Sequence, residues 1–198
     1  MNSLTPTLRA AVDASTADDS PTAMRLLTQA VSEDPSSALA HYLMGVELAS
    51  SGAMPEAESA LAMALILDGS LAMARYQLGL LQFTDGRVAI ALQTWEPLLL
   101  LQATDPLPQL VRGFGLLASD QFVEARTLFL AALDLSENRP LQSDIRRILE
   151  RIDHAVATSN CAPVGVAMHS SPESEEKFED SDFNHVLLSN YQSQGQVH

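Results

Sequence analysis

The side chains that could carry chemistry are few and scattered along this chain. The histidines form no His-x-x-x-His pair, and they are listed in chain order as His41, His154, His169, His185 and His198. Cys161 is the only cysteine, so it forms neither an internal disulfide nor a Cys-x-x-Cys motif. The sequence also has no glycine-rich phosphate loop and no serine elbow between glycines. It therefore predicts a non-enzymatic protein with no catalytic residues, no cofactor-binding residues and no metal ligands.

The clustered charges have ordinary structural explanations. The neighbouring carboxylates Asp18 and Asp19, like Glu56 and Glu58, stand at expected helix starts, where they complement the positive end of the helix dipole. Three arginines lie close together at 146, 147 and 151. They could form an anion site, or they could be the solvated face of a terminal helix. The second interpretation is favoured.

Composition narrows the class of partner. The chain has 198 residues, a net charge of −14 and few aromatic residues, and its apolar residues are mostly leucine and alanine, which predicts an all-α fold. An acidic chain without basic clusters repels nucleic acid and anionic membrane surfaces. No apolar run, including Leu98–Leu101, is long enough for membrane insertion, and the first residues do not resemble a secretory signal. The predicted location is cytoplasmic.

A 34-residue period organises most of the chain. The recurring positions are Gly45, Gly79 and Gly113; Gly52 and Gly86; Ala57, Ala91 and Ala125; and Leu61, Trp95 and Phe129. Small residues that recur at a fixed period of this length are typical of helical repeat arrays. We expect repeats at about 4–37, 38–71, 72–105 and 106–139, followed by a capping helix at about 141–157.

The second predicted repeat shows how each unit is built. Its first helix ends at Gly52, and Pro55 lies in the first turn of its second helix, where the missing N–H costs nothing. Gly45 lies mid-helix at a cost of about 1 kcal/mol relative to alanine. Close approach of the paired helix must offset that cost, with Ala57 as the expected facing surface.

The motif His41-x-x-Met44-Gly45-x-x-Leu48, followed by Ala57-x-x-x-Leu61, resembles the tetratricopeptide repeat (TPR). The resemblance covers about residues 4–139. It implies an α-α superhelix of about four helical hairpins plus the capping helix. It also implies a protein-binding groove on the concave face, lined by the first helices of successive repeats.

The same resemblance implies which residues line that groove, on the stripe not used for packing against the second helices. They are Leu39, Tyr42, Val46, Met73, Tyr76, Leu80, Phe83, Leu110, Phe114 and Leu117. This apolar stripe lacks the basic residues of a clamp for acidic peptide ends, so we expect it to bind an apolar helix or extended segment. Its aromatic residues are the expected anchors. The alternative is that part of the stripe packs against neighbouring helices.

The end of the chain differs in composition. Residues 158–182 are rich in acidic residues and are predicted to be a flexible acidic linker. Residues 183–198 follow as a short apolar C-terminal segment. Its apolar residues are Phe183, Val186, Leu187, Leu188 and Tyr191. They either dock into the groove of the same chain or remain disordered.

These features favour an adaptor or scaffold that binds another protein through an apolar segment in the groove. Its own C-terminal segment is a second candidate occupant of that groove. The alternative is a cytoplasmic chaperone for secreted apolar clients, since the size, acidity and apolar groove resemble chaperones of type III secretion. Neither hypothesis involves nucleic acid, membrane insertion or a cofactor. Homo-oligomerisation stays open.

Overall fold

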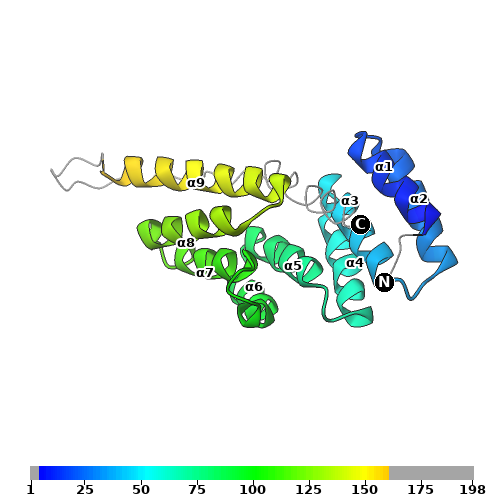
Figure 1. The fold of residues 1–198 in the computed structure, drawn as a ribbon, viewed down its shortest axis with the longest axis horizontal. Helices are drawn as coiled ribbons and strands as arrows, with labels where there is room; N and C mark the ends of the chain where they lie inside the picture. The colour runs from blue at the N-terminus through cyan, green and yellow to red at the C-terminus, as the bar shows by residue number, and fades with distance from the viewer. Residues whose placement is uncertain (1–4, 161–198) are drawn as a thin grey trace, which may run out of the picture.

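The computed structural model describes residues 5–160, and every regular element within them is a helix. The helices stack side by side in an elongated array, with α9 lying along α8 at one end (Figure 1). In chain order they are α1 Pro6–Thr16, α2 Ser20–Glu33, α3 Ala38–Ser50, α4 Met54–Leu67, α5 Ala72–Thr84, α6 Val88–Trp95, the 3₁₀ helix η1 Glu96–Leu100, α7 Leu107–Leu117, α8 Phe122–Leu135 and α9 Arg139–Asn160. The predicted all-α repeat fold is confirmed.

The C-terminal predictions fall largely outside the described residues. Helix α9 begins at Arg139 and continues to Asn160, so it includes residues 158–160 of the predicted linker. The rest of that linker and the predicted docking residues between Phe183 and Tyr191 lie beyond the part of the chain that the structure describes.

Each hairpin turns through a left-handed residue at the same place in the repeat. Gly52 and Gly86 have φ of 82° and 76°, and the equivalent residues of the first and fourth hairpins, Asp18 and Asp120, have φ of 57° and 55°. Glycine adopts this conformation without steric cost, whereas in aspartate the Cβ comes close to a backbone carbonyl oxygen and raises the energy. The 34-residue period therefore extends to backbone conformation, even where the residue type changes.

Three mid-helix glycines allow the two helices of a hairpin to approach closely. A Cβ built on Gly45 would lie 2.7 Å from Cγ of Leu61, and one on Gly113 would lie 2.9 Å from Cε2 of Phe129. The tightest approach is at Gly79, where a Cβ would lie 2.2 Å from Nε1 of Trp95. The predicted role of these glycines is confirmed. The main facing group is the large residue sixteen positions later, while Ala57 contributes its carbonyl oxygen.

The third hairpin departs from regularity. Helix α6 ends at Trp95 after 8 residues, and the chain continues as the 3₁₀ helix η1. Pro97 lies in the first turn of η1 and has no N–H to donate to the preceding α-helical turn. The second helix of this repeat is therefore shorter than α4 or α8, each of which has 14 residues.

Helix α9 ends the array because only one of its faces is apolar. The residues on that face are buried, namely Leu141, Ile145, Ile148, Leu149 and Ile152. The repeat step from Gly113 leads to Arg147, which is exposed, so no second helix packs there. A terminal helix of this kind covers the last apolar surface of a repeat array.

The core consists of two clusters along the array. One joins α1 to α5 around Leu61, and the other joins α5 to α9 around Trp95 and Phe114. Met73 of α5 is half-buried and packs against both clusters. The two clusters therefore meet at α5, which contributes buried residues to both.

Candidate peptide-binding surface

The structure divides the predicted groove residues into two groups. Those buried at 5% exposure or less are Tyr42, Val46, Tyr76, Leu80, Leu110 and Phe114. Those that are half-buried are Leu39, Met73, Phe83 and Leu117. All ten belong to the two core clusters or pack against them. The stripe therefore stabilises the fold as well as forming a surface.

Tyr76, Phe83 and Phe114 of the stripe contact second helices, which differs from the sequence prediction. The ring of Trp95 in α6 lies 6.1 Å from that of Tyr76, 5.8 Å from that of Phe83 and 5.2 Å from that of Phe114, between centroids. Phe114 also makes an edge contact with Phe129 of α8 at 5.2 Å. The expectation that this stripe does not pack against the second helices is wrong for these residues. The physical reason is the size of Trp95, which reaches past Gly79 to the first helices.

Tyr76 lies at the centre of this packing. The Nε1 of Trp95 donates a hydrogen bond to the backbone carbonyl of Tyr76 at 2.9 Å. Burial raises the pKa of the Tyr76 hydroxyl, and the carboxylate of Asp144 in α9 raises it further because it disfavours a second negative charge. The tyrosine therefore stays neutral at physiological pH and acts as a packing residue.

A second apolar surface lies on the second helices, and the sequence analysis missed it. Every large apolar side chain classed as exposed in the described residues belongs to α4, α6, η1 or α8. They are Met63, Ile66, Leu67, Ile90, Leu92, Leu99, Leu100, Val123 and Leu130. The signal was present, since these residues interrupt the polar face expected on an outer helix. Only a contiguous patch of such residues is informative about binding.

A hollow opens on this side where α6 and η1 meet α7. Its volume is about 360 Å³, and its walls include Leu92, Leu99 and Val111, with Glu96 and Arg112 as the charged lining residues. Its walls come from α6 and η1 on one side and from α7 on the other.

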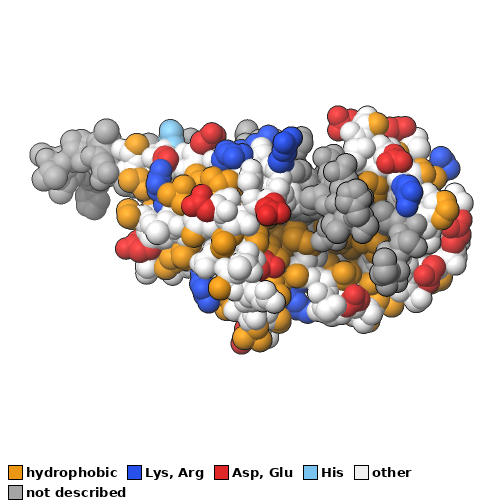
Figure 2. Space-filling model, viewed as in Figure 1, with side chains coloured by type: hydrophobic (Ala, Val, Ile, Leu, Met, Phe, Trp, Pro, Cys, Tyr) orange, Lys and Arg blue, Asp and Glu red, His pale blue; other side chains and the backbone are white. Residues whose placement is uncertain are grey.

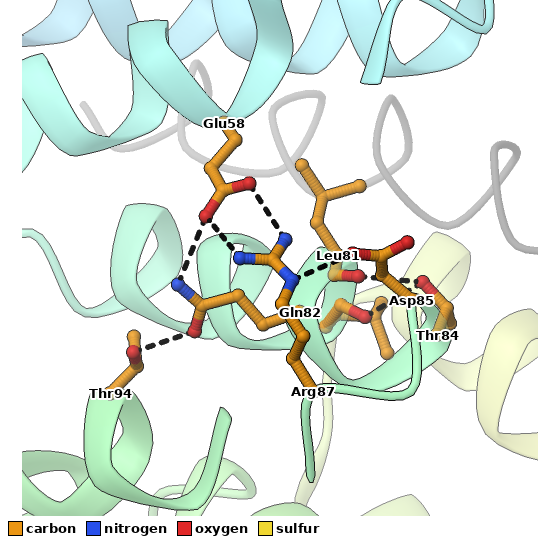
Figure 3. Close-up of polar contacts among 8 residues, drawn as sticks. Glu58, Leu81, Gln82, Thr84, Asp85, Arg87 and Thr94 are labelled. Atoms are coloured by element: carbon orange, nitrogen blue, oxygen red, sulfur yellow. Dashed lines mark hydrogen bonds and ion pairs between the residues drawn. The ribbon is translucent and has the colours of Figure 1, made fainter. Parts of the chain in front are cut away.

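A polar cluster fixes the second hairpin against the third (Figure 3). Arg87 donates two hydrogen bonds to the carboxylate of Glu58 in α4, at 2.8 and 2.7 Å, and a third to Asp85 at 2.6 Å. Gln82 donates to Glu58 at 3.4 Å and accepts from Thr94 at 2.7 Å. The hydrogen bonds from Arg87 lower the pKa of Glu58. This cluster links α4 of the second hairpin to α5 and α6 of the third by side-chain hydrogen bonds.

A similar contact joins the first two hairpins. The hydroxyl of Ser15 in α1 donates to Oε2 of Glu47 in α3 at 2.9 Å, and Glu47 is 1% exposed. Its other oxygen, Oε1, is buried and has no hydrogen-bond partner among residues 5–160. Burying a carboxyl oxygen without a hydrogen bond costs folding free energy, so Glu47 lowers the stability of this interface.

Within residues 5–160, no group of three or more histidine, cysteine or acidic side chains is arranged to hold a metal ion. The helices of that range also include none with the length and apolar character needed to cross a membrane. His41 contacts the carbonyl oxygen of Pro35 at 3.1 Å, which gives it a local structural role.

Comparison with solved structures supports the repeat fold. MamA residues 41 to the end, from Desulfovibrio magneticus RS-1, matches with a TM-score of 0.57 and 17% identity, over 80% of this chain and 90% of that one. The ArsTM double mutant of MamA RS-1 matches with a TM-score of 0.56 and 16% identity, over 97% of this chain and 99% of that one. MamA is a TPR-like helical repeat protein. This chain has a TPR-like fold. At this level of identity the likeness concerns the fold alone. No protein-family model and no curated protein matches the sequence.

Proposed function

We propose that this protein is a non-enzymatic interaction scaffold that binds an apolar segment of another protein along the first helices of its repeats. The observation that carries the proposal is two pairs of half-buried apolar side chains, each pair 34 residues apart on successive first helices. Leu39 in α3 and Met73 in α5 lie near the starts of their helices, and Phe83 in α5 and Leu117 in α7 lie near the ends. Figure 2 shows hydrophobic side chains gathered over α5, in the middle of the view. Apolar residues at equivalent positions of successive helices suit an apolar helix or strand laid across them.

The buried residues of the stripe support the proposed surface from beneath. Tyr76 and Phe114 are 1% and 2% exposed and pack on Trp95, so they hold the half-buried residues in place. Binding energy would come from the side chains that still have area to bury. Leu39, Met73, Phe83 and Leu117 are the proposed contacts, and the buried aromatics are their supports.

We further propose that the segment 183–191 of the same chain competes for this surface. That segment carries apolar residues beyond an acidic stretch, and it is tethered to the end of α9. A tether gives a high effective concentration, so even a weak contact is well populated. A partner would then have to displace the segment before it binds.

The binding proposal is tested with peptides selected by phage display against the full-length protein. We expect apolar peptides, and we expect Met73→Lys and Leu117→Lys each to weaken their affinity by about tenfold or more, because a charge replaces a buried apolar contact. Ile66→Lys is the matched control, since Ile66 is 76% exposed on α4 and lies outside the proposed surface. Equal affinities for all three variants would place the binding surface elsewhere.

Competition by the segment is tested separately, with the same peptides. Substituting Leu187 and Leu188 by aspartate in the full-length chain should raise peptide affinity, because the tethered competitor loses its apolar contacts. Deleting residues 158–198 should have the same effect and should increase the binding of a dye that reports exposed apolar surface. Unchanged affinity in both variants would rule out self-occlusion while leaving the peptide-binding proposal intact.

A further inference from the structure

The junction of α6 and η1 presents an exposed apolar knob beside an apolar hole. Leu100, the last residue of η1, is 89% exposed, the highest value among the exposed large apolar side chains of the described residues. The end of α6 and η1 project from the lower edge of the molecule in Figure 1, and hydrophobic side chains cover that tip in Figure 2. The hollow of about 360 Å³ lies next to it, walled by Leu92 and Leu99 on one side and Val111 on the other.

The charges around the hollow are of opposite sign and come from opposite walls. Glu96 belongs to η1 and Arg112 to α7, and both side chains are exposed. The ion pairs found within residues 5–160 do not join them. A surface that carries one acid and one base is complementary to a second copy of itself across a two-fold axis, because each contact occurs twice with the roles exchanged.

We propose that this surface is the interface of a homodimer. Leu100 of each protomer enters the hollow of its partner, and Glu96 of each faces Arg112 of the other across the two-fold axis. This occupant fits better than the chain's own C-terminal residues 161–198, which carry six acidic residues and one lysine and so do not match a surface with balanced charges. The knob, the hole and the two charges all belong to one short stretch of surface, as an isologous contact requires.

Sedimentation equilibrium of the full-length protein tests the proposal. The wild type should have twice the chain mass of 21.3 kDa. Leu100→Glu should raise the dimer dissociation constant by about tenfold or more, since it places a carboxylate in an apolar hollow. Glu96→Arg and Arg112→Glu should each do the same through like-charge repulsion, and the double variant with both changes should recover dimerisation. Circular dichroism checks that each variant, altered only at an exposed residue, is folded.

Two controls make the outcome decisive. Ile66→Glu introduces the same charge on another exposed apolar residue, in α4, and should leave the mass unchanged. A wild-type chain that sediments as a monomer would overturn the proposal. So would a double charge exchange that stays as weak as its single variants. If the wild type is monomeric but becomes dimeric when Leu187 and Leu188 are changed to aspartate, the C-terminal segment occupies the hollow instead, which also overturns it.

Discussion

Gly79 of α5 and Trp95 of α6 form the closest helix-to-helix approach among the glycines of the described residues. A Cβ at position 79 would lie within 2.6 Å of three atoms of the indole ring. Trp95 is 0% exposed, and its Nε1 donates to the carbonyl of Tyr76 one turn before Gly79. The indole is therefore held against the one residue of α5 that leaves room for it.

Gly79→Ala should destabilise the protein by about 1–3 kcal/mol, because the added methyl group overpacks a site from which the indole has no free direction to move. Urea denaturation followed by circular dichroism measures the loss. Trp95, the only tryptophan, gives a second signal from the same site.

Gly115→Ala is the matched control for that substitution. Gly115 is also inside a first helix, α7, but the nearest contact of its added Cβ would be Cδ2 of Leu92 at an ordinary 3.7 Å. Alanine favours the helix over glycine, so this variant should be neutral or more stable by up to about 1 kcal/mol. Equal losses at 79 and 115 would show that helix propensity, and not packing on Trp95, governs both positions.

Asp120→Gly should raise the stability of the protein. Asp120 has φ of 55°, which costs an L-residue about 1–2 kcal/mol, while glycine adds an unfolded-state entropy cost of about 0.4–1 kcal/mol. The expected gain is up to about 1 kcal/mol, measured as a shift in the urea midpoint. Asp134→Gly, at an exposed position in the last turn of α8, should instead lower stability by about 0.3 kcal/mol, since aspartate is only slightly better than glycine in a helix.

The attachment of α9 should depend on apolar packing. Ile145 is 0% exposed in the core, and Ile145→Ala should cost about 2–5 kcal/mol. By contrast, Asp153→Asn breaks the exposed ion pair with Arg126, whose Nε lies 2.6 Å from Oδ1, and should leave the unfolding midpoint unchanged at physiological salt. Similar losses of stability in the two variants would contradict the expectation that apolar packing, and not the ion pair, attaches α9.

The ion pair between Glu58 and Arg87 should contribute to stability in a pH-dependent way. The pKa of Glu58 is lower in the folded protein than its ordinary value of 4.5, mainly because of the hydrogen bonds from Arg87. The contribution is therefore fully present above pH 4.5 and is lost as the pH falls through the depressed folded value. The side chains of Arg87 and Glu58 are 35% and 32% exposed, so solvent screens the pair. Its contribution to the free energy of unfolding at pH 7 should be about 1 kcal/mol or less.

Urea denaturation of Glu58→Gln and the wild type, at pH 7 and then at decreasing pH, measures the contribution of this ion pair to stability. The difference between the two proteins should shrink below pH 4.5 and should also decrease at high salt. A double-mutant cycle with Arg87→Met isolates the pair from other acidic groups. A difference that persists unchanged at low pH would assign the effect to something other than the ion pair.

The repeat period could be predicted from residues alone because helix pairing imposes a local size rule. The missing side chain of Gly45 leaves space for Leu61, sixteen residues later. Gly113 and Phe129 repeat this relation at the same spacing. The left-handed turns at Asp18 and Asp120 were harder to predict than the one at Gly52. Glycine often adopts positive φ, whereas aspartate does so only occasionally. The early end of α6 at Trp95, just before Pro97, was likewise not predicted from the sequence.

The sequence by itself determined the class of fold, since the 34-residue spacing of small residues and the proline and glycine signals are local properties of each hairpin. Only the tertiary structure decided which apolar residues are core and which face outward. Trp95 packs on Tyr76 of its own hairpin and on Phe114 of the next, and both are buried. Ile66 on α4 and Leu100 on η1 are left exposed. Periodicity reports which residues share a face of one helix, but burial depends on what the neighbouring helices place against that face.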